Sequence, residues 1–312
     1  SPALVGAGSR ALQHGAEGAG AAPEQRLPPR LERALRLHTP WPDAQRMRAL
    51  VTLAMPRADL SAREAAYIPS ILLQTPFATA LDLSHNSLGP DWAALLEQGF
   101  ERCEEMTALD LFGCGIGDLA GLPAALANTN TATARGMVRL GFGGNALQPQ
   151  GLRLLPAALK ETPKLRSLDL RRNPLGEVGG RLLAMGLRHT PLLTSLFLGE
   201  CSLGPRGAQF LAEGLLDTIE LEELTMECND IGAEGAWELA QPFQRMRRLA
   251  TLDLTWNAMG QEGVRALAFG LQHCRALSRL SLGGNALDPT VERELTAGIR
   301  QTASGLLLPP GG

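Results

Sequence analysis

The sequence predicts an α/β solenoid: a curved right-handed arc of about nine repeats, with parallel strands on its concave face and helices on its convex face. A phrase of the form L-x-L-x-x-N-x-L recurs along the chain, with its first leucine at positions 53, 81, 109, 140, 168, 196, 224, 252 and 280. Successive origins are 28 residues apart, except that 109 and 140 are 31 apart. A constant period of this length indicates supersecondary units that bury their apolar faces against one another.

Each repeat is expected to hold a strand and then a helix. In Leu81-Asp82-Leu83 apolar residues alternate with a polar one, as in a strand with one buried face. Residues 92–100 change to helical spacing, and apolar residues recur fifteen positions after each origin, at Ile68, Leu96, Ala124, Leu155, Leu183, Leu211, Leu239, Leu267 and Leu295. Strands joined through helices run parallel with right-handed crossovers. Helices are wider than the strand spacing of about 4.8 Å, so the stack curves with the strands inside.

A polar residue is expected to hold the turn after each strand. Five residues after the origin, six repeats carry asparagine, at positions 86, 145, 173, 229, 257 and 285, and two others carry Cys114 and Cys201. An amide both donates and accepts, so it can satisfy backbone groups that the inward turn leaves outside the sheet. We therefore predict packing roles for these two cysteines.

The 28-residue period, this alternation of asparagine with cysteine, and phrases such as LDLRRNPLGEVGGRLLAMGL at 168–187 resemble the ribonuclease-inhibitor-type leucine-rich-repeat family. Similar repeats form the C-terminal domains of NOD-like receptors. The resemblance covers about residues 50–304 and implies a leucine-rich-repeat solenoid. It implies no single activity, because this solenoid serves unrelated functions.

Four segments are predicted along the chain. Residues 1–27 form a flexible extension rich in alanine and glycine, and residues 28–49 an N-terminal cap with a helix at 30–38. Residues 50–304 form the repeat domain, and residues 305–312 an edge strand and tail. The cap is expected because a terminal repeat would otherwise expose its core. The extra residues of the long repeat fall in the polar stretch 128–136, which predicts a loop on the rim.

Charge and cysteine content favour no special class of partner. The chain has 29 basic and 32 acidic residues, which predicts no specific nucleic-acid binding. Its five cysteines include no CxxC pair, so neither a disulfide framework nor a zinc site is indicated. An intracellular setting, cytoplasmic or organellar, is therefore expected. The apolar runs fall short of the roughly 18 residues that a membrane span needs, and the chain begins with Ser1, as a processed or truncated product would.

No catalytic, cofactor or metal site is predicted, and the protein is expected not to be an enzyme. The segment GCGIG at 113–117 lacks part of the dinucleotide fingerprint, and Lys160 and Lys164 stand outside any Walker motif. His189 and His273 share a repeat position but are three repeats apart. We interpret the carboxylates one residue after the origins as ordinary solvent-facing residues of the repeat: Asp82, Asp110, Asp169 and Asp253.

The predicted site lies on the concave face, where the fold leaves some positions free. These are the positions one before and one, three and four after each origin, and the partner-binding residues predicted there are His85, Phe112, Arg171, Arg172, Phe197, Glu200, Glu227 and Trp256. The aromatic residues Phe112, Phe197 and Trp256 are the leading contacts, since aromatic side chains dominate binding hot spots.

The predicted function is a non-enzymatic scaffold or structural subunit that binds a protein partner, either as a free adaptor or within a large multi-subunit assembly. Two alternatives stay open. One is a ligand-sensing or regulatory fragment of a NOD-like receptor, and the other is a Ran-type GTPase-activating protein.

Overall fold

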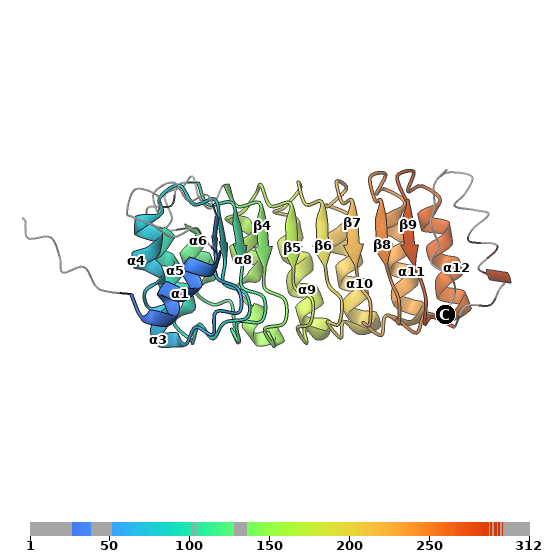
Figure 1. Cartoon of the computed structure of the whole chain (residues 1–312). Coiled ribbons are helices and arrows are strands. Elements are labelled where there is room, and N and C mark those ends of the chain that lie inside the picture. The colour runs from blue at the N-terminus through green and yellow to red at the C-terminus, as the bar shows by residue number, and fades with distance from the viewer. Residues whose placement is uncertain are drawn as a thin grey trace, which may run out of the picture.

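A computed structural model describes residues 27–38, 52–100, 103, 105–127 and 136–286, together with 288, 290, 291, 293 and 295. The extension at 1–26, the second half of the predicted cap, nearly all of the 128–136 loop and the predicted edge strand at 305–312 lie outside these residues. Within them, the chain forms a single row of repeats, with one sheet along one side and helices along the other (Figure 1).

The sheet contains nine parallel strands in chain order, from β1 to β9. They are β1 Thr52–Ala54, β2 Ala80–Asp82, β3 Ala108–Asp110, β4 Arg139–Gly141, β5 Ser167–Asp169, β6 Ser195–Phe197, β7 Glu223–Thr225, β8 Thr251–Asp253 and β9 Arg279–Ser281. The middle residue of every strand is the leucine that starts a repeat, and these leucines pair in register from Leu53 with Leu81 to Leu252 with Leu280. The predicted α/β solenoid and all nine origins are confirmed.

The helices stack in the same order as the strands (Figure 1). They are α1 Pro29–His38, α3 Ala62–Ala65, α4 Ile68–Gln74, α5 Trp92–Phe100, α6 Leu122–Ala127, the 3-10 turn η1 Pro149–Leu152, α8 Leu155–Lys160, α9 Gly176–Leu187, α10 Gly204–Leu215, α11 Gly232–Phe243 and α12 Gly260–Leu271. The helix expected at 30–38 is α1, which packs against β1 through Leu31, Ala34 and Leu35.

Proline explains why some helices of the first repeats are short. Pro69 and Pro156 stand at the beginning of α4 and α8, where a helix tolerates a residue without an N–H group. In the same repeats the preceding turn is split off as α3 and η1. Pro69 and Pro156 share one repeat position, sixteen residues after the origin, and helices α9 to α12 carry alanine there. Each of these four helices runs for 12 residues.

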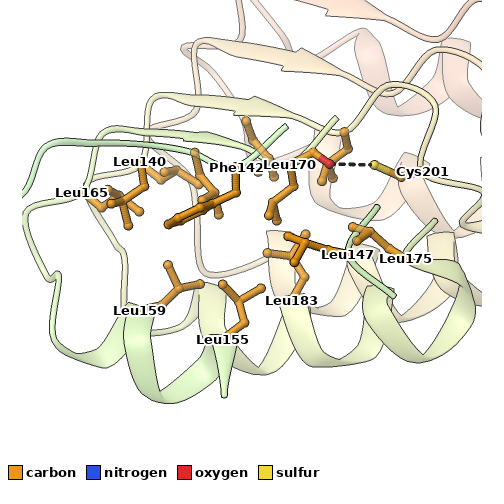
Figure 2. Close-up of a cluster of buried hydrophobic side chains, with 14 of the residues drawn as sticks. Leu140, Phe142, Leu147, Leu155, Leu159, Leu165, Leu170, Leu175, Leu183 and Cys201 are labelled. Carbon is orange, nitrogen blue, oxygen red and sulfur yellow. Dashed lines mark hydrogen bonds between the residues drawn. The ribbon is translucent and has the colours of Figure 1, made fainter. Parts of the chain in front are cut away.

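The core lies between the sheet and the helices. Leu140 and Leu170 from the strand side meet Leu155 and Leu183 from the helix side, and Phe142 fills the space between them (Figure 2). All five side chains are fully buried. Burying apolar surface in this way is the main favourable contribution to folding, at about 25 cal/mol for each Å².

One expected core position is wrong. Ala124, fifteen residues after Leu109, is exposed, and Ala125 is buried in its place. The buried Leu122 and Ala125 stand thirteen and sixteen residues after their origin, whereas Ala93 and Leu96 stand twelve and fifteen after theirs. One of the three extra residues of the long repeat therefore lies before α6 and shifts the buried positions of this helix by one.

Buried asparagines join neighbouring repeats at the turn after each strand. The side-chain Nδ2 of Asn257 donates to the carbonyl of Leu254 in its own repeat, at 3.0 Å, and to that of Met226 in the preceding repeat, at 2.8 Å. Its Oδ1 accepts from the N–H groups of Asn229, at 3.0 Å, and Ile231, at 3.4 Å. Both the donor and the acceptor of the amide are used, as the sequence predicts.

In two repeats a cysteine replaces the asparagine, and its thiol supplies the donor to the preceding repeat. The thiol of Cys201 donates to the carbonyl of Leu170 in the preceding repeat, at 3.3 Å (Figure 2), and Cys114 donates to that of Leu83, at 3.0 Å. Both side chains are buried. The predicted packing role of these cysteines therefore includes a hydrogen bond between repeats.

Replacing Asn257 should show how much its hydrogen bonds between repeats contribute to the stability of the fold. We expect Asn257→Ala to lower the free energy of unfolding by about 2–4 kcal/mol, because it leaves buried N–H and C=O groups without partners. Asn257→Cys should lose less, because the chain itself uses cysteine at this position and the thiol restores one donor. Urea unfolding followed by circular dichroism measures both variants. Equal losses would show that the amide hydrogen bonds contribute little.

Candidate functional site

The strand face is the inner surface of the arc, formed by the sides of β1 to β9 that point away from the helices and by the turns that follow the strands. Residues three and four after each origin lie in those turns. Four of the predicted site residues stand four positions after an origin, and each has a left-handed backbone: His85 (φ 58°), Arg172 (φ 56°), Glu200 (φ 57°) and Trp256 (φ 55°). Three other repeats place glycine there, at 113, 144 and 284. A side chain in this conformation strains the backbone, so these side chains are not required by the turn.

Two aromatic rings lie flat against glycines of the next repeat. A Cβ atom added to Gly143 would stand 2.5 Å from the Phe112 ring, and one added to Gly284 would stand 2.5 Å from the Trp256 ring. Glycine is therefore needed at both places to let the rings approach the backbone. The rings are supported from below and keep their upper faces toward the strand face.

Arg171 joins two of the predicted aromatic residues into one cluster. Its guanidinium carbon lies 5.8 Å from the ring centre of Phe112 and 5.3 Å from that of Phe197. Both distances are within the range of cation–π attraction. His85 extends the row, with its ring centre 5.3 Å from that of Phe112. Four predicted residues are thus brought together, and we call His85, Phe112, Arg171 and Phe197 the central cluster.

A carboxylate holds Arg171 in place. Its Nε and Nη2 lie 2.8 and 2.7 Å from Oδ2 of Asp169. This hydrogen bond is the main reason why the pKa of Arg171 is raised above its ordinary value, and the negative charges of Asp169 and Glu227 add to the increase. The guanidinium is therefore a fixed positive charge between two rings.

Glu227 lies next to this cluster with incomplete hydrogen bonding. Its carboxylate covers Gly199, in the space where any larger residue would place its Cβ. Within the described part of the chain, its Oε2 is buried and has no hydrogen-bond donor. A buried carboxylate oxygen without a donor is unfavourable, so this part of the face carries some strain.

The other predicted residues lie further along the strand face. Arg172 and Glu200 form an ion pair of 2.9 Å in which both side chains are at least half exposed. Such a pair contributes at most about 1 kcal/mol to stability. Trp256 stands two repeats beyond Phe197, with 67% of its surface exposed. Its exposure makes it available as a separate contact.

The aspartates expected to be ordinary solvent-facing residues interact with one another. Asp82 and Asp110 are paired in register, Gly141 follows on the next strand, and Asp169 follows on the one after. Partial burial raises the pKa of Asp110, and the negative charges of Asp82 and Asp169 raise it further. The hydrogen bond from the Phe112 N–H group and the positive charge of Arg171 lower this pKa, but by less. Nowhere in the described residues do three or more His, Cys, Asp or Glu side chains gather so as to hold a metal ion.

Two exposed aromatic residues on the helices were missed by reasoning from the strands alone. Trp237 on α11 and Phe269 on α12 have 63% and 60% of their surfaces exposed. The corresponding residues 28 positions earlier are Gln209 and Gln241. A comparison of helix positions from repeat to repeat would have identified both.

Among the described helices, none is long and apolar enough to cross a membrane.

Comparison with known proteins supports this class of fold. A family model described as Leucine Rich repeat matches residues 103–122, 163–184, 221–240 and 248–268. The chain matches no curated protein sequence. It is similar to the solved structure of a leucine-rich-repeat protein from Leptospira interrogans, with a TM-score of 0.48 and 16% identity, over 77% of this chain and 56% of that one. The parallel sheet, its helices and the matched repeats define a leucine-rich-repeat solenoid.

The cysteines should differ sharply in reactivity. All five are free, and only Cys228 is exposed. Burial raises the pKa of Cys103 and Cys114 to about 11 and of Cys201 and Cys274 to about 12. The thiolate is the reactive form, so one thiol should react rapidly with Ellman's reagent in the folded chain and the other four only after unfolding. Cys228→Ser should abolish the rapid phase, and a second rapid thiol would contradict the burial assignments.

Asp110→Asn should stabilise the chain slightly at neutral pH. The pKa of Asp110 is higher in the folded chain, so ionisation lowers stability as the pH rises above the unfolded value of about 3.9. Asparagine keeps an acceptor for the Phe112 N–H group, which lies 2.9 Å from Oδ1, and removes the repulsion from Asp82 and Asp169. Thermal melting should give a higher midpoint for the variant at neutral pH and equal midpoints below the unfolded pKa. A lower midpoint at neutral pH would show that attraction to Arg171 outweighs the repulsion.

Proposed function

We propose that this chain is a non-enzymatic scaffold or structural subunit that binds a protein partner on its strand face. The observation that carries the proposal is the central cluster, where Arg171 lies between the rings of Phe112 and Phe197. Tryptophan, tyrosine and arginine are the residues most enriched in binding hot spots, and aromatic contacts in general are enriched at interfaces.

The cluster is already ordered before a partner arrives. Phe112 rests on the backbone of Gly143, and Asp169 fixes the guanidinium of Arg171. Ordering a flexible side chain at an interface costs about 0.5–1.5 kcal/mol. A cluster held by its neighbours avoids much of this cost, which favours binding.

The charges around the cluster define what a partner should offer. Arg171 retains exposed surface and favours a carbonyl or carboxylate acceptor. The rings of Phe112 and Phe197 favour an apolar or aromatic contact. A folded protein surface that presents an apolar side chain beside an acceptor meets both requirements.

We also assign the repeats to the ribonuclease-inhibitor type and the chain to an intracellular compartment. The subtype is supported by the 28-residue register and by Cys114 and Cys201, whose thiols replace asparagine as donors between repeats. The compartment is supported by the five free thiols, which are typical of a reducing environment. Either a free adaptor or a subunit of a large assembly fits this description.

Affinity purification with mass spectrometry tests the proposed face. The bait is the chain, compared with the combined variant Phe112→Ala, Phe197→Ala and Trp256→Ala. A partner that uses the strand face should bind the variant about 10-fold more weakly or worse. Phe77→Ala is the control, because Phe77 is an aromatic residue about as exposed as Trp256, at 61% against 67%, and lies outside the proposed site.

Cys228 offers a second test that leaves the sequence unchanged. It lies on the same face between Glu200 and Trp256 in the order of repeats, and it is exposed. A bulky maleimide attached to Cys228 should block the same partner, whereas labelling the Cys228→Ser chain should not. A partner retained by both the combined variant and the labelled chain would contradict binding on the strand face.

A further inference from the structure

The helix face carries two exposed aromatic residues that the fold does not require. Trp237 and Phe269 lie on the neighbouring helices α11 and α12, which bury Leu239, Phe243 and Leu267 against the core instead. The repeat position of Trp237 holds Gln209 on α10 and Arg265 on α12, and that of Phe269 holds Gln241 on α11. Since polar residues serve at the same positions, the aromatic rings contribute something other than packing.

An apolar groove of about 610 Å³ separates the two rings. Its floor contains Ala240 and Ala266, two small residues between the larger rings. Both rings are more than half exposed, at 63% and 60%. A groove with a small-residue floor and aromatic walls fits an apolar side chain from another molecule.

A second groove, of about 470 Å³, lies on the other side of Trp237, between α10 and α11. Three carboxylates line it: Glu234 and Glu238 on α11, and Glu262 on α12. One cation, Arg206, is also in the lining, and its Nη1 donates to Oε1 of Gln209 at 3.0 Å. Arg265 lines the first groove beside Glu262. The two grooves around Trp237 thus hold three carboxylates and two arginines, a small negative excess, and the face of an indole ring itself attracts cations.

We propose that the helix face from α10 to α12 is a docking surface for a segment of a protein partner with adjacent apolar and basic side chains. The apolar side chain enters the groove between Trp237 and Phe269, and an arginine or lysine lies over Trp237 among Glu234, Glu238 and Glu262. Charge complementarity selects this occupant, because the carboxylates repel phosphate groups and acidic segments. This surface is separate from the strand face, so the scaffold holds two partners at once.

Random peptides displayed on phage provide the probe, with the chain as bait. Peptides are selected on the unaltered chain and then tested individually by fluorescence anisotropy. The first variant combines Trp237→Gln and Phe269→Gln, which introduces residues that the chain already uses 28 positions earlier at Gln209 and Gln241. The second variant combines Glu234→Gln, Glu238→Gln and Glu262→Gln, which removes the charges and keeps the shapes. The strand-face variant of Phe112, Phe197 and Trp256 is the control.

We expect the selected peptides to carry arginine or lysine within one helical turn of an apolar residue. Affinity should fall about 10-fold or more in the aromatic variant and about 3- to 10-fold in the charge variant, where added salt should also matter less. The strand-face control should bind as the unaltered chain does. Thermal melting confirms that each variant is folded, and the two helix-face variants test the surface independently of each other.

Three results would overturn the proposal. The first is a selection that yields no peptide sensitive to Trp237→Gln and Phe269→Gln. The second is enrichment of neutral or acidic peptides, which would contradict the charge argument. The third is concentration-dependent self-association of the chain that the aromatic variant abolishes, because a second copy would then be the occupant. Failure of the strand-face test, by contrast, leaves this surface intact.

Discussion

The structure depends on the hydrogen bonds that buried amides make between neighbouring repeats. At the end of each strand the chain turns inward toward its helix, and the turn leaves backbone groups that the sheet cannot pair. Asn257 bonds five of them at once, three carbonyls through Nδ2 and two N–H groups through Oδ1, and three of the five belong to the preceding repeat. The amide therefore closes its own turn and fixes the distance and register to its neighbour. A chain that repeats this bond can stack only with the leucines of successive strands side by side.

That register determines which side chains meet on the strand face. Phe112, Arg171 and Phe197 come from three different repeats, yet they form one cluster because each occupies a fixed place relative to its origin leucine. The intervening repeat contributes Gly143, whose missing side chain gives the Phe112 ring its place. The glycines of this face thus leave room for its large residues, and both kinds of residue give the strand face its shape.

The sequence was sufficient to predict the backbone and insufficient to predict most contacts between long side chains. The strand centres, the asparagine ladder and the exposure of Trp256 follow from period and alternation alone, because the sheet register transmits them unchanged. The pairing of Arg171 with Asp169, and its place between two rings, depends on rotamers chosen among several repeats, which a period does not encode. Ala124 was misplaced because an insertion can be absorbed on either side of a helix. Trp237 and Phe269 were not predicted, because the helix position that recurs between repeats is the buried one, fifteen after the origin, and the outward-facing helix positions show no such regularity.

The strand face and the proposed docking surface on the helices lie on opposite sides of the core. Leu224 and Leu252 anchor β7 and β8, while Leu239 and Leu267 anchor α11 and α12, and all four are fully buried between the strand face and the helix face. The turns that carry Cys228 and Trp256 belong to the same repeats as Trp237 and Phe269 but lie on the other side of this leucine layer. Close-packed leucines hold the two faces at a fixed separation, because a close-packed interior is hardly compressible. Because the leucines and the amide set the register, the residues on the two faces can differ from one repeat to the next, as Trp237 and Gln209 do on the helices and Trp256 and Gly284 do on the strand face.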